Sequence, residues 1–150
     1  MKDDGMSIEV LLVEDSPGDA RLTREAFRDS GMPVRVHLAA DGIEAMAFLR
    51  REGIYANAPR PDLILLDLNL PKMDGREVLA LIKKDQDLKI IPTIILTTSD
   101  DEADVMVSYQ LQANCYLRKP AHWDAFDSLV RSINAFWLTR AKLPQQMQNV

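Results

Sequence analysis

Short apolar runs alternate with stretches of helical periodicity along this chain. Most of these runs are rich in leucine and β-branched residues, and each is about as long as one strand. The third run, Leu63-Ile64-Leu65-Leu66, is apolar at successive positions, as expected of a strand that is buried on both faces. The alternation predicts an α/β protein in which five helices cover a doubly wound, five-stranded parallel sheet. The expected strands lie near 8–13, 34–39, 62–67, 91–97 and 114–118, and the expected helices near 17–30, 42–52, 75–85, 101–111 and 122–138.

Residue types that begin helices stand just before most of these helical stretches. Ser16-Pro17-Gly18-Asp19 supplies a capping serine, a first-turn proline and an acid three residues after the serine. Asp41 and Asp74 are expected to cap the second and third helices, and Ser99 or Asp100 the fourth.

Four of the apolar runs end on polar residues of types that phosphoryl chemistry uses. The carboxyl ends of parallel strands share one edge of a sheet, and ligands of doubly wound sheets bind in the crevice beyond that edge. The sequence therefore predicts that three carboxylates, a hydroxyl and an ammonium gather at one edge. These groups belong to Glu14, Asp15, Asp67, Thr97 and Lys119.

Three neighbouring carboxylates repel one another, by about 4 kcal/mol for a pair 4 Å apart at an effective dielectric near 20. Such a cluster either raises a pKa or holds a cation, and Mg²⁺ prefers hard oxygen ligands with room for water. Asp67 is the best nucleophile for attack on phosphorus, and Lys119, Thr97 and the metal could balance the charge of the transition state. The alternative is that acids after strands only cap helices. Helix capping is a good explanation of Glu14-Asp15 taken alone, but it explains the full set with Asp67, Thr97 and Lys119 less well.

A set of motifs carries a family resemblance. Five motifs together resemble the receiver domain of two-component response regulators. They are Val13-Glu14-Asp15, the segment from Asp67 to Gly75, Thr97, Tyr116 and Lys119-Pro120. The resemblance covers about residues 7–138 and implies a flavodoxin-like sheet with strand order 2-1-3-4-5.

The resemblance also implies the role of each site residue. Asp67 is expected to accept a phosphoryl group from the phosphohistidine of a sensor histidine kinase. Mg²⁺ is expected to be held by Asp15, Asp67 and the backbone carbonyl of Asn69, with Glu14 contributing through a water molecule. Lys119 is expected to contact the phosphate. A protein of this kind is not an enzyme in the ordinary sense, since it catalyses only its own phosphorylation and dephosphorylation.

Two residues are expected to act as a switch. Thr97 would turn its hydroxyl toward the phosphate, and Tyr116 would move into the space that Thr97 vacates. The alternative is that both are ordinary strand residues, since threonine and tyrosine favour strands. The bond from Lys119 to Pro120 is expected to be cis, an isomer that is common only before proline.

The last helix carries more aromatic area than one packed face requires. Trp123, Phe126, Val130, Ile133 and Trp137 recur at steps of three and four residues and form one apolar stripe. The surplus indicates either a well-filled core or a protein interface. The family resemblance favours a homodimer through the fourth helix, the fifth strand and the fifth helix. The expected dimer face comprises Val105, Tyr109, Phe126, Phe136 and Trp137.

Composition narrows the function classes. The chain has 150 residues, of which 47% are apolar and 27% charged, so it can fold as one globular domain. Its net charge of −5 argues against a nucleic-acid surface. No apolar run reaches the roughly 18 residues of a membrane helix, and the acidic N-terminus does not resemble a secretory signal. A lone cysteine, Cys115, fits the cytoplasm. The expected organisation is a tail over 1–6, a receiver domain over 7–140 and a tail over 141–150.

Softer resemblances suggest the partner. Several segments resemble free-standing regulators that partner bacterial and cyanobacterial phytochromes. These segments are 60–66, 75–80, 114–117 and 136–138, together with the long loop over 53–61.

Three rival functions stay open. A receiver-like module could bind partners without phosphorylation. An aspartyl-phosphate phosphatase would need an acid two residues after Asp67, where Asn69 stands and cannot deliver a proton. A nucleotide or flavin binder would need a glycine-rich loop after the first strand, where only Gly18 is present.

Overall fold

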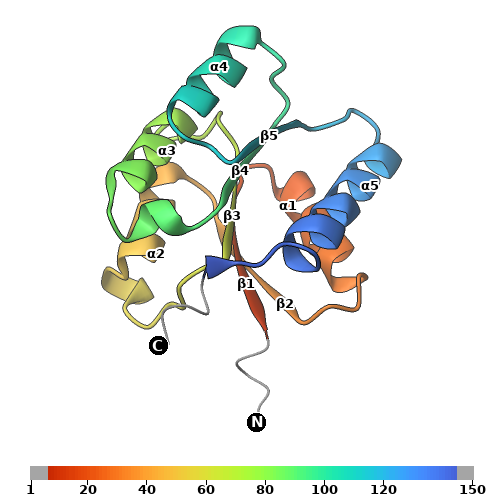
Figure 1. Ribbon diagram of the computed structural model, residues 1–150, viewed down its shortest axis with the longest axis horizontal. Coiled ribbons are helices and arrows are strands. Elements are labelled where there is room, and N and C mark those ends of the chain that lie inside the picture. The colour runs from red at the N-terminus through yellow and green to blue at the C-terminus, as the bar shows by residue number, and fades with distance from the viewer. Residues whose placement is uncertain (1–6, 145–150) are drawn as a thin grey trace.

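The structure, a computed structural model, describes residues 7–144. The expected N-terminal tail, 1–6, and residues 145–150 of the expected C-terminal tail lie outside the described residues. Five parallel strands form one sheet in the order β2-β1-β3-β4-β5, which confirms the predicted flavodoxin-like topology (Figure 1). The strands are β1 (Ile8–Val13), β2 (Val34–Ala39), β3 (Leu63–Leu66), β4 (Thr93–Thr97) and β5 (Cys115–Arg118).

The five predicted helices are all present in the described residues. They are α1 (Pro17–Arg28), α2 (Gly42–Arg50), α3 (Gly75–Lys84), α4 (Glu102–Gln110) and α5 (Trp123–Ile133). Short 3₁₀ turns, η2 (Gly53–Tyr55) and η3 (Leu88–Ile90), lie in the connections that precede β3 and β4. None of the helices in residues 7–144 combines the length and the hydropathy that a membrane span requires.

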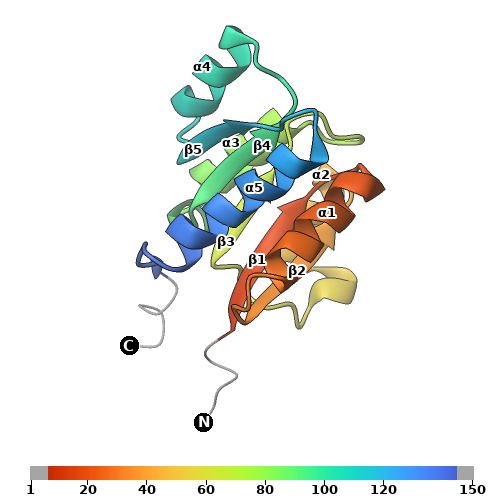
Figure 2. The same cartoon turned by 90° about the vertical axis from the view of Figure 1, so that its right-hand side faces the viewer.

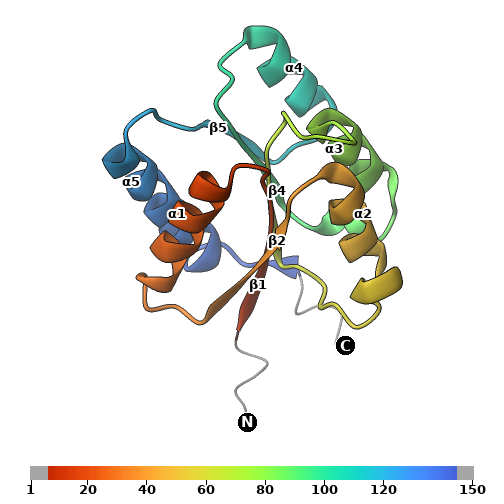
Figure 3. The same ribbon diagram turned by 180° about the vertical axis from the view of Figure 1, so that it is seen from behind.

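The sheet has a hydrophobic core on each face because successive side chains of a strand point in opposite directions. Val10 and Leu12 of β1 pack in the cluster that α1 and α5 cover (Figure 2). Leu11 and Val13 pack in the cluster that α2 and α3 cover on the other face (Figure 3). Burial on both faces explains why the central strands are apolar at successive positions.

The register of the central strands determines where the site forms. Val13, the last residue of β1, lies opposite Leu66, the last residue of β3, and opposite Ala39 at the end of β2. The residues that follow β1 and β3 therefore leave the sheet side by side at its carboxyl edge. The backbone confirms this alignment, since the Asp67 amide donates to the Val13 carbonyl at 3.0 Å.

Helix α4 is packed less deeply than its neighbours. Among its residues only Ser108 is buried, while Met106 and Tyr109 are exposed. The prediction that Ser99 or Asp100 caps this helix was wrong: Asp101 is the cap, and its carboxylate accepts from the Ala103 amide at 2.9 Å. The Ser99 hydroxyl instead donates to Asp104 at 2.6 Å, so it joins the loop to the first turn of the helix.

Two further expectations differ from the structure. The helix predicted over 122–138 is α-helical only to Ile133 and continues as one π-helical turn, Asn134–Leu138. No cis peptide bond occurs in residues 7–144, so the expectation of a cis bond between Lys119 and Pro120 was wrong for this structure. An X–Pro bond favours the trans isomer by about 0.5–1 kcal/mol, and Lys119 reaches the carboxyl edge from the trans backbone.

Candidate functional site

Three carboxylates meet at the carboxyl edge of the sheet. Glu14, Asp15 and Asp67 each place an oxygen within 4.8 Å of the other two. Glu14 and Asp67 are buried, whereas Asp15 is exposed and opens the group toward solvent. The predicted convergence of these three acids is therefore present in the structure.

The loop after β3 is held tightly beneath Asp67. The Asn69 amide donates to Asp67 Oδ1 at 3.1 Å, and the Gly75 amide donates to the Leu68 carbonyl at 2.9 Å. A Cβ atom on Gly75 would lie only 2.2 Å from the Asp67 carbonyl oxygen and 2.5 Å from Leu68 Cα. Glycine is therefore required at this position because the backbone that carries the central carboxylate passes over it. The sequence indicated only a turn and a helix start there.

Lys119 lies at the centre of the acids. Its Nζ atom donates to Glu14 Oε1 at 2.5 Å and to Asp67 Oδ2 at 3.0 Å. It also donates to Asp19 Oδ2 at 3.0 Å. From the sequence, Asp19 was expected only to help begin α1, and its amide does donate to the capping Ser16 hydroxyl at 3.3 Å. The one signal for a further role was its position in the first helical turn after the carboxyl end of β1.

The candidate switch residues lie on either side of one loop. The buried Thr97 hydroxyl donates to Asp67 Oδ1 at 2.9 Å. The Tyr116 hydroxyl donates to the Ser99 carbonyl at 2.8 Å, across the segment that joins β4 to α4. The loop is also tied to α3, because Arg76 donates to Asp104 at 2.5 Å and Ser99 donates to the same carboxylate. A displacement at Thr97 would therefore act on a loop with fixed contacts to two helices.

Burial sets the electrostatics of the cluster. Burial raises the pKa of Glu14 to about 7, against the opposing effect of the Lys119 ammonium. Burial acts to lower the pKa of Lys119, but the carboxylates of Glu14 and Asp67 outweigh it and raise that pKa. The ammonium is therefore charged at neutral pH, and it stabilises the negative charge of its carboxylate partners.

The donor set fits a hard divalent cation. Three carboxylates offer only oxygen atoms, and a single ammonium does not neutralise them. Because Asp15 is exposed, a bound ion could keep water ligands on its solvent side, as Mg²⁺ commonly does. When bound, such an ion offsets negative charge and orients an incoming phosphoryl group.

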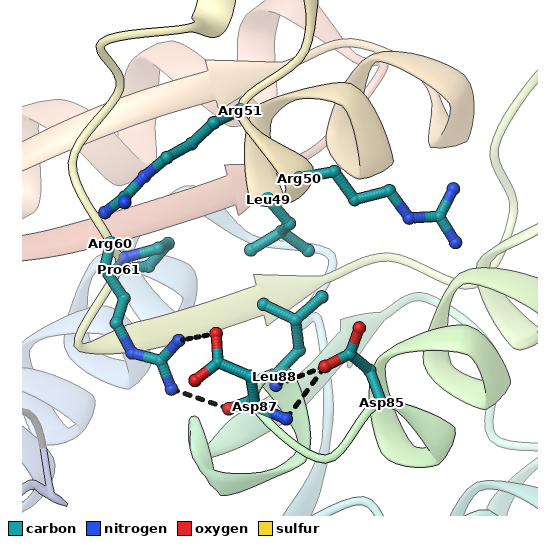
Figure 4. Close-up of a pocket in the computed structure, with 8 residues that line it drawn as sticks. All are labelled: Leu49, Arg50, Arg51, Arg60, Pro61, Asp85, Asp87 and Leu88. Atoms are coloured by element: carbon teal, nitrogen blue, oxygen red, sulfur yellow. Dashed lines mark hydrogen bonds and ion pairs between the residues drawn. The ribbon is translucent and has the colours of Figure 1, made fainter.

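A hollow elsewhere in the molecule lies away from the acids. It encloses about 400 Å³ between the end of α2, the segment before β3 and the turn after α3. Figure 4 shows Arg60 paired with Asp87, and these groups are 2.9 Å apart. Asp85 accepts from the amides of Asp87 and Leu88, so it closes the turn rather than facing a ligand. These contacts explain the charged lining as structural, and the acid cluster remains the better candidate site.

The expected dimer face is only partly exposed. Tyr109 and Phe136 are 47% and 56% exposed, and Val105 and Trp137 are half-buried. The inclusion of Phe126 was wrong, because its side chain is only 4% exposed and packs in the core beneath α1 and α5. Phe126 lies on the helical stripe with Val130 and Ile133, which faces the sheet.

Comparisons with known proteins agree with this geometry. The family model for the response regulator receiver domain matches residues 10–131. The response regulator Rcp1 of Synechocystis is 52% identical over 135 residues, which are 90% of this chain and 92% of that protein.

Two solved structures are also similar. The Mn²⁺-bound form of Rcp1 has a TM-score of 0.89 and 51% identity, and the match covers 91% of this chain and 99% of that one. The phosphorylated cyanobacterial phytochrome response regulator RcpA has a TM-score of 0.90 and 54% identity, with 92% and 99% of the two chains covered.

Proposed function

The chain belongs to the response-regulator receiver family, and we propose that it accepts a phosphoryl group on Asp67 from a sensor histidine kinase. One observation carries the proposal: Asp67 lies within 4.8 Å of two further carboxylates and accepts hydrogen bonds from both Lys119 and Thr97. In this proposal Asp67 is the nucleophile, and the ammonium of Lys119 and the hydroxyl of Thr97 would contact the phosphoryl group.

The proposed step is an in-line displacement at phosphorus. An Asp67 carboxylate oxygen forms the new P–O bond while the bond to the leaving group breaks, and the leaving group keeps the electron pair. Charge on the transferring oxygens needs to be offset during the transfer. Lys119 and Thr97 already contact the two carboxylate oxygens of Asp67, so both groups lie next to the position of the transferring phosphoryl group.

Mg²⁺ is the proposed cofactor. Asp15, Asp67 and the Asn69 backbone carbonyl are the proposed ligands, with Glu14 contributing through water. The carboxylate oxygens within 4.8 Å of one another support this set. The Mn²⁺-bound form of a relative supports a divalent ion as the cofactor.

Thr97 and Tyr116 are the proposed switch. A phosphoryl group adds about −1.5 to −2 charges directly beside the Thr97 hydroxyl. Movement of Thr97 would shift the loop that Tyr116 contacts through the Ser99 carbonyl. Because few side chains anchor α4, it is the element most easily displaced by that loop.

The proposed partners follow from the relatives and from the surface. A phytochrome-type histidine kinase is the proposed phosphodonor, since a phytochrome response regulator is among the similar structures. Val105, Tyr109, Phe136 and Trp137 form the proposed homodimer face once Phe126 is removed from it. We place the protein in the cytoplasm and propose that it signals through protein contacts, without binding nucleic acid.

Incubation with acetyl phosphate and Mg²⁺, followed by intact mass measurement, tests the proposal. The wild-type protein should gain one phosphoryl group, and the Asp67→Asn variant should gain none. If neither protein gains mass, a receiver-like module that binds partners without phosphorylation becomes the better interpretation. Transient labelling with rapid turnover of many phosphodonors would favour the phosphatase instead. Assays with candidate kinases in darkness and in red light then address the partner.

A further inference from the structure

Asp19 is a fourth carboxylate at the site, and the proposed chemistry gives it no role. It lies in the first turn of α1, and its Oδ2 atom accepts from Lys119 Nζ at 3.0 Å. It does not belong to the group of three carboxylates that could hold a metal ion. Its contact with the central cation therefore needs a separate explanation.

The ammonium of Lys119 has no donor to spare. An ammonium carries three N–H groups, and Lys119 directs one to each of three carboxylates, those of Glu14, Asp19 and Asp67. A phosphoryl oxygen on Asp67 would be a further acceptor. Lys119 can contact that oxygen well only if it gives up one of its present partners.

Asp19 is the partner that can be released at the lowest cost. The side chains of Glu14 and Asp67 are 3% and 9% exposed, whereas that of Asp19 is 31% exposed. A buried carboxylate left without a donor loses its solvation, but a partly exposed one regains water. Asp19 also lies at the N-terminal end of a helix, where the backbone dipoles favour a negative charge.

We infer that Asp19 holds Lys119 in the unphosphorylated protein and thereby slows the phosphorylation of Asp67. The inference rests on the proposed function of Asp67. A contact that is stronger in the ground state than in the transition state raises the barrier to reaction. The contact between Lys119 and Asp19 is of this kind, because it competes with the contact between Lys119 and the transferring phosphoryl group. Asp19 is thus a positioning residue that sets the response rate of the site.

The test compares phosphorylation rates at saturating Mg²⁺. Acetyl phosphate donates the phosphoryl group: its P–O bond to acetate breaks, acetate leaves with the electron pair, and Asp67 forms the new P–O bond. Asp19→Asn keeps the size of the side chain and removes its charge. We expect its rate, followed by intact mass, to exceed the wild-type rate by about three- to tenfold, as for the net contribution of one typical hydrogen bond.

A matched variant separates the loss of the contact between Asp19 and Lys119 from the loss of one negative charge on α1. Glu25→Gln removes one negative charge from the same helix, where Glu25 pairs with Arg21 on the surface. Its rate should stay within about twofold of the wild-type rate, as expected for an exposed ion pair. The gain in Asp19→Asn should also persist at high salt. Salt screens a direct, partly buried contact less than it screens the repulsion between a negatively charged donor and the protein surface.

Asp19→Ala provides a second readout. If Asp19 restrains Lys119, alanine should accelerate phosphorylation at least as much as asparagine does. If Asp19 instead orients Lys119 for the reaction, alanine should slow it and asparagine should restore part of the rate. Unchanged or slower phosphorylation in both variants would overturn the inference. Failure of the proposed function itself would look different, since the wild-type protein would then gain no phosphoryl group.

Discussion

The strand β1 has a buried carboxylate near each of its ends, and only one of them belongs to the site. Glu9 follows the first residue of the strand, and Glu14 follows its last residue. The side chains of both are largely withdrawn from water, at 11% and 3% exposure. Both ends of β1 therefore carry a buried acid.

The amino end of β1 has a donor for each buried acid. Glu9 lies 2.7 Å from His37 Nε2 and accepts from Arg35 at 3.3 Å. Asp62 accepts from the Glu9 amide at 2.8 Å, which joins the start of β1 to the residue before β3. The His37 ring also packs on Phe48 of α2, with ring centres 5.3 Å apart.

The carboxyl end has more acids than cations. Lys119 faces Glu14, Asp19 and Asp67, and Asp15 lies beside them. Burial of a carboxylate alone therefore does not make a metal-binding or phosphorylation site. A surplus of carboxylates, open to solvent on one side, leaves negative charge that a divalent cation can neutralise.

The largest effect on stability and on phosphorylation should come from replacing Lys119, the cation at the carboxyl end of β1. Lys119→Met removes the ammonium that faces the buried carboxylates of Glu14 and Asp67, which should lower the free energy of unfolding by about 3 kcal/mol in metal-free buffer. Mg²⁺ should restore part of that loss, while phosphorylation should fall by at least about 100-fold. Urea unfolding with EDTA or with Mg²⁺ measures the first effect and intact mass the second. Lys84→Met, at an exposed position in the last turn of α3, serves as the control. Equal stability of both variants would contradict the role given to Lys119.

Next in size should be the effect of a methyl group beneath the loop that carries Asp67. Gly75→Ala places a Cβ atom against the Asp67 carbonyl, so it should lower the free energy of unfolding by about 2 kcal/mol and also slow phosphorylation. In the matched variant Gly18→Ala, the new Cβ meets nothing within 4 Å and lies in helix α1. That variant should be neutral or more stable by about 0.5–1 kcal/mol. Thermal and urea unfolding of the two variants measures these effects. Equal stability of Gly75→Ala and Gly18→Ala would refute the close approach of the Asp67 backbone to Gly75.

A smaller effect should follow from reducing the surplus of acids. Asp15→Asn should weaken Mg²⁺ binding by about tenfold, or about 1.4 kcal/mol, while slightly stabilising the metal-free protein. The rise in melting temperature with added Mg²⁺ reports this affinity. Asp124→Asn removes the same charge from an exposed position on α5 and should leave the Mg²⁺ response unchanged. Identical Mg²⁺ responses in the wild type and Asp15→Asn would remove Asp15 from the ligand set.

The smallest expected effect concerns the amino end. Burial raises the pKa of Asp62, and the nearby Glu9 charge adds to this shift. Between the unfolded and the raised folded pKa, the folded protein holds a proton that the unfolded chain has lost. Stability therefore falls as pH rises through that window. Asp62→Asn can still accept from the Glu9 amide but cannot ionise, so it should lack this fall. Urea midpoints across mildly acidic pH test this, and parallel profiles for the two proteins would contradict it.

Much of this fold was readable from local sequence patterns. The strand order came from the family resemblance, but the five strands and helices followed from apolar runs and helical periodicity. Ser16, Asp41 and Asp74 cap their helices as predicted, because a cap is a contact between residues close in the chain. The cap of α4 was misplaced, since three candidate polar residues precede that helix and Ser99 is engaged with Asp104.

The sequence by itself determined which residue types stand at the carboxyl ends of the strands, because chain direction and side-chain alternation are local properties. It therefore predicted that Glu14, Asp15 and Asp67 would meet, and the structure confirms that they do. Only the tertiary structure decided that Asp19 shares Lys119, that Asp62 accepts from the Glu9 amide at the other end of β1, and that Phe126 faces the core. Those contacts join residues far apart in the chain, or depend on which face of a helix meets the sheet. Their geometry follows from how whole elements pack, and no local pattern fixes that packing.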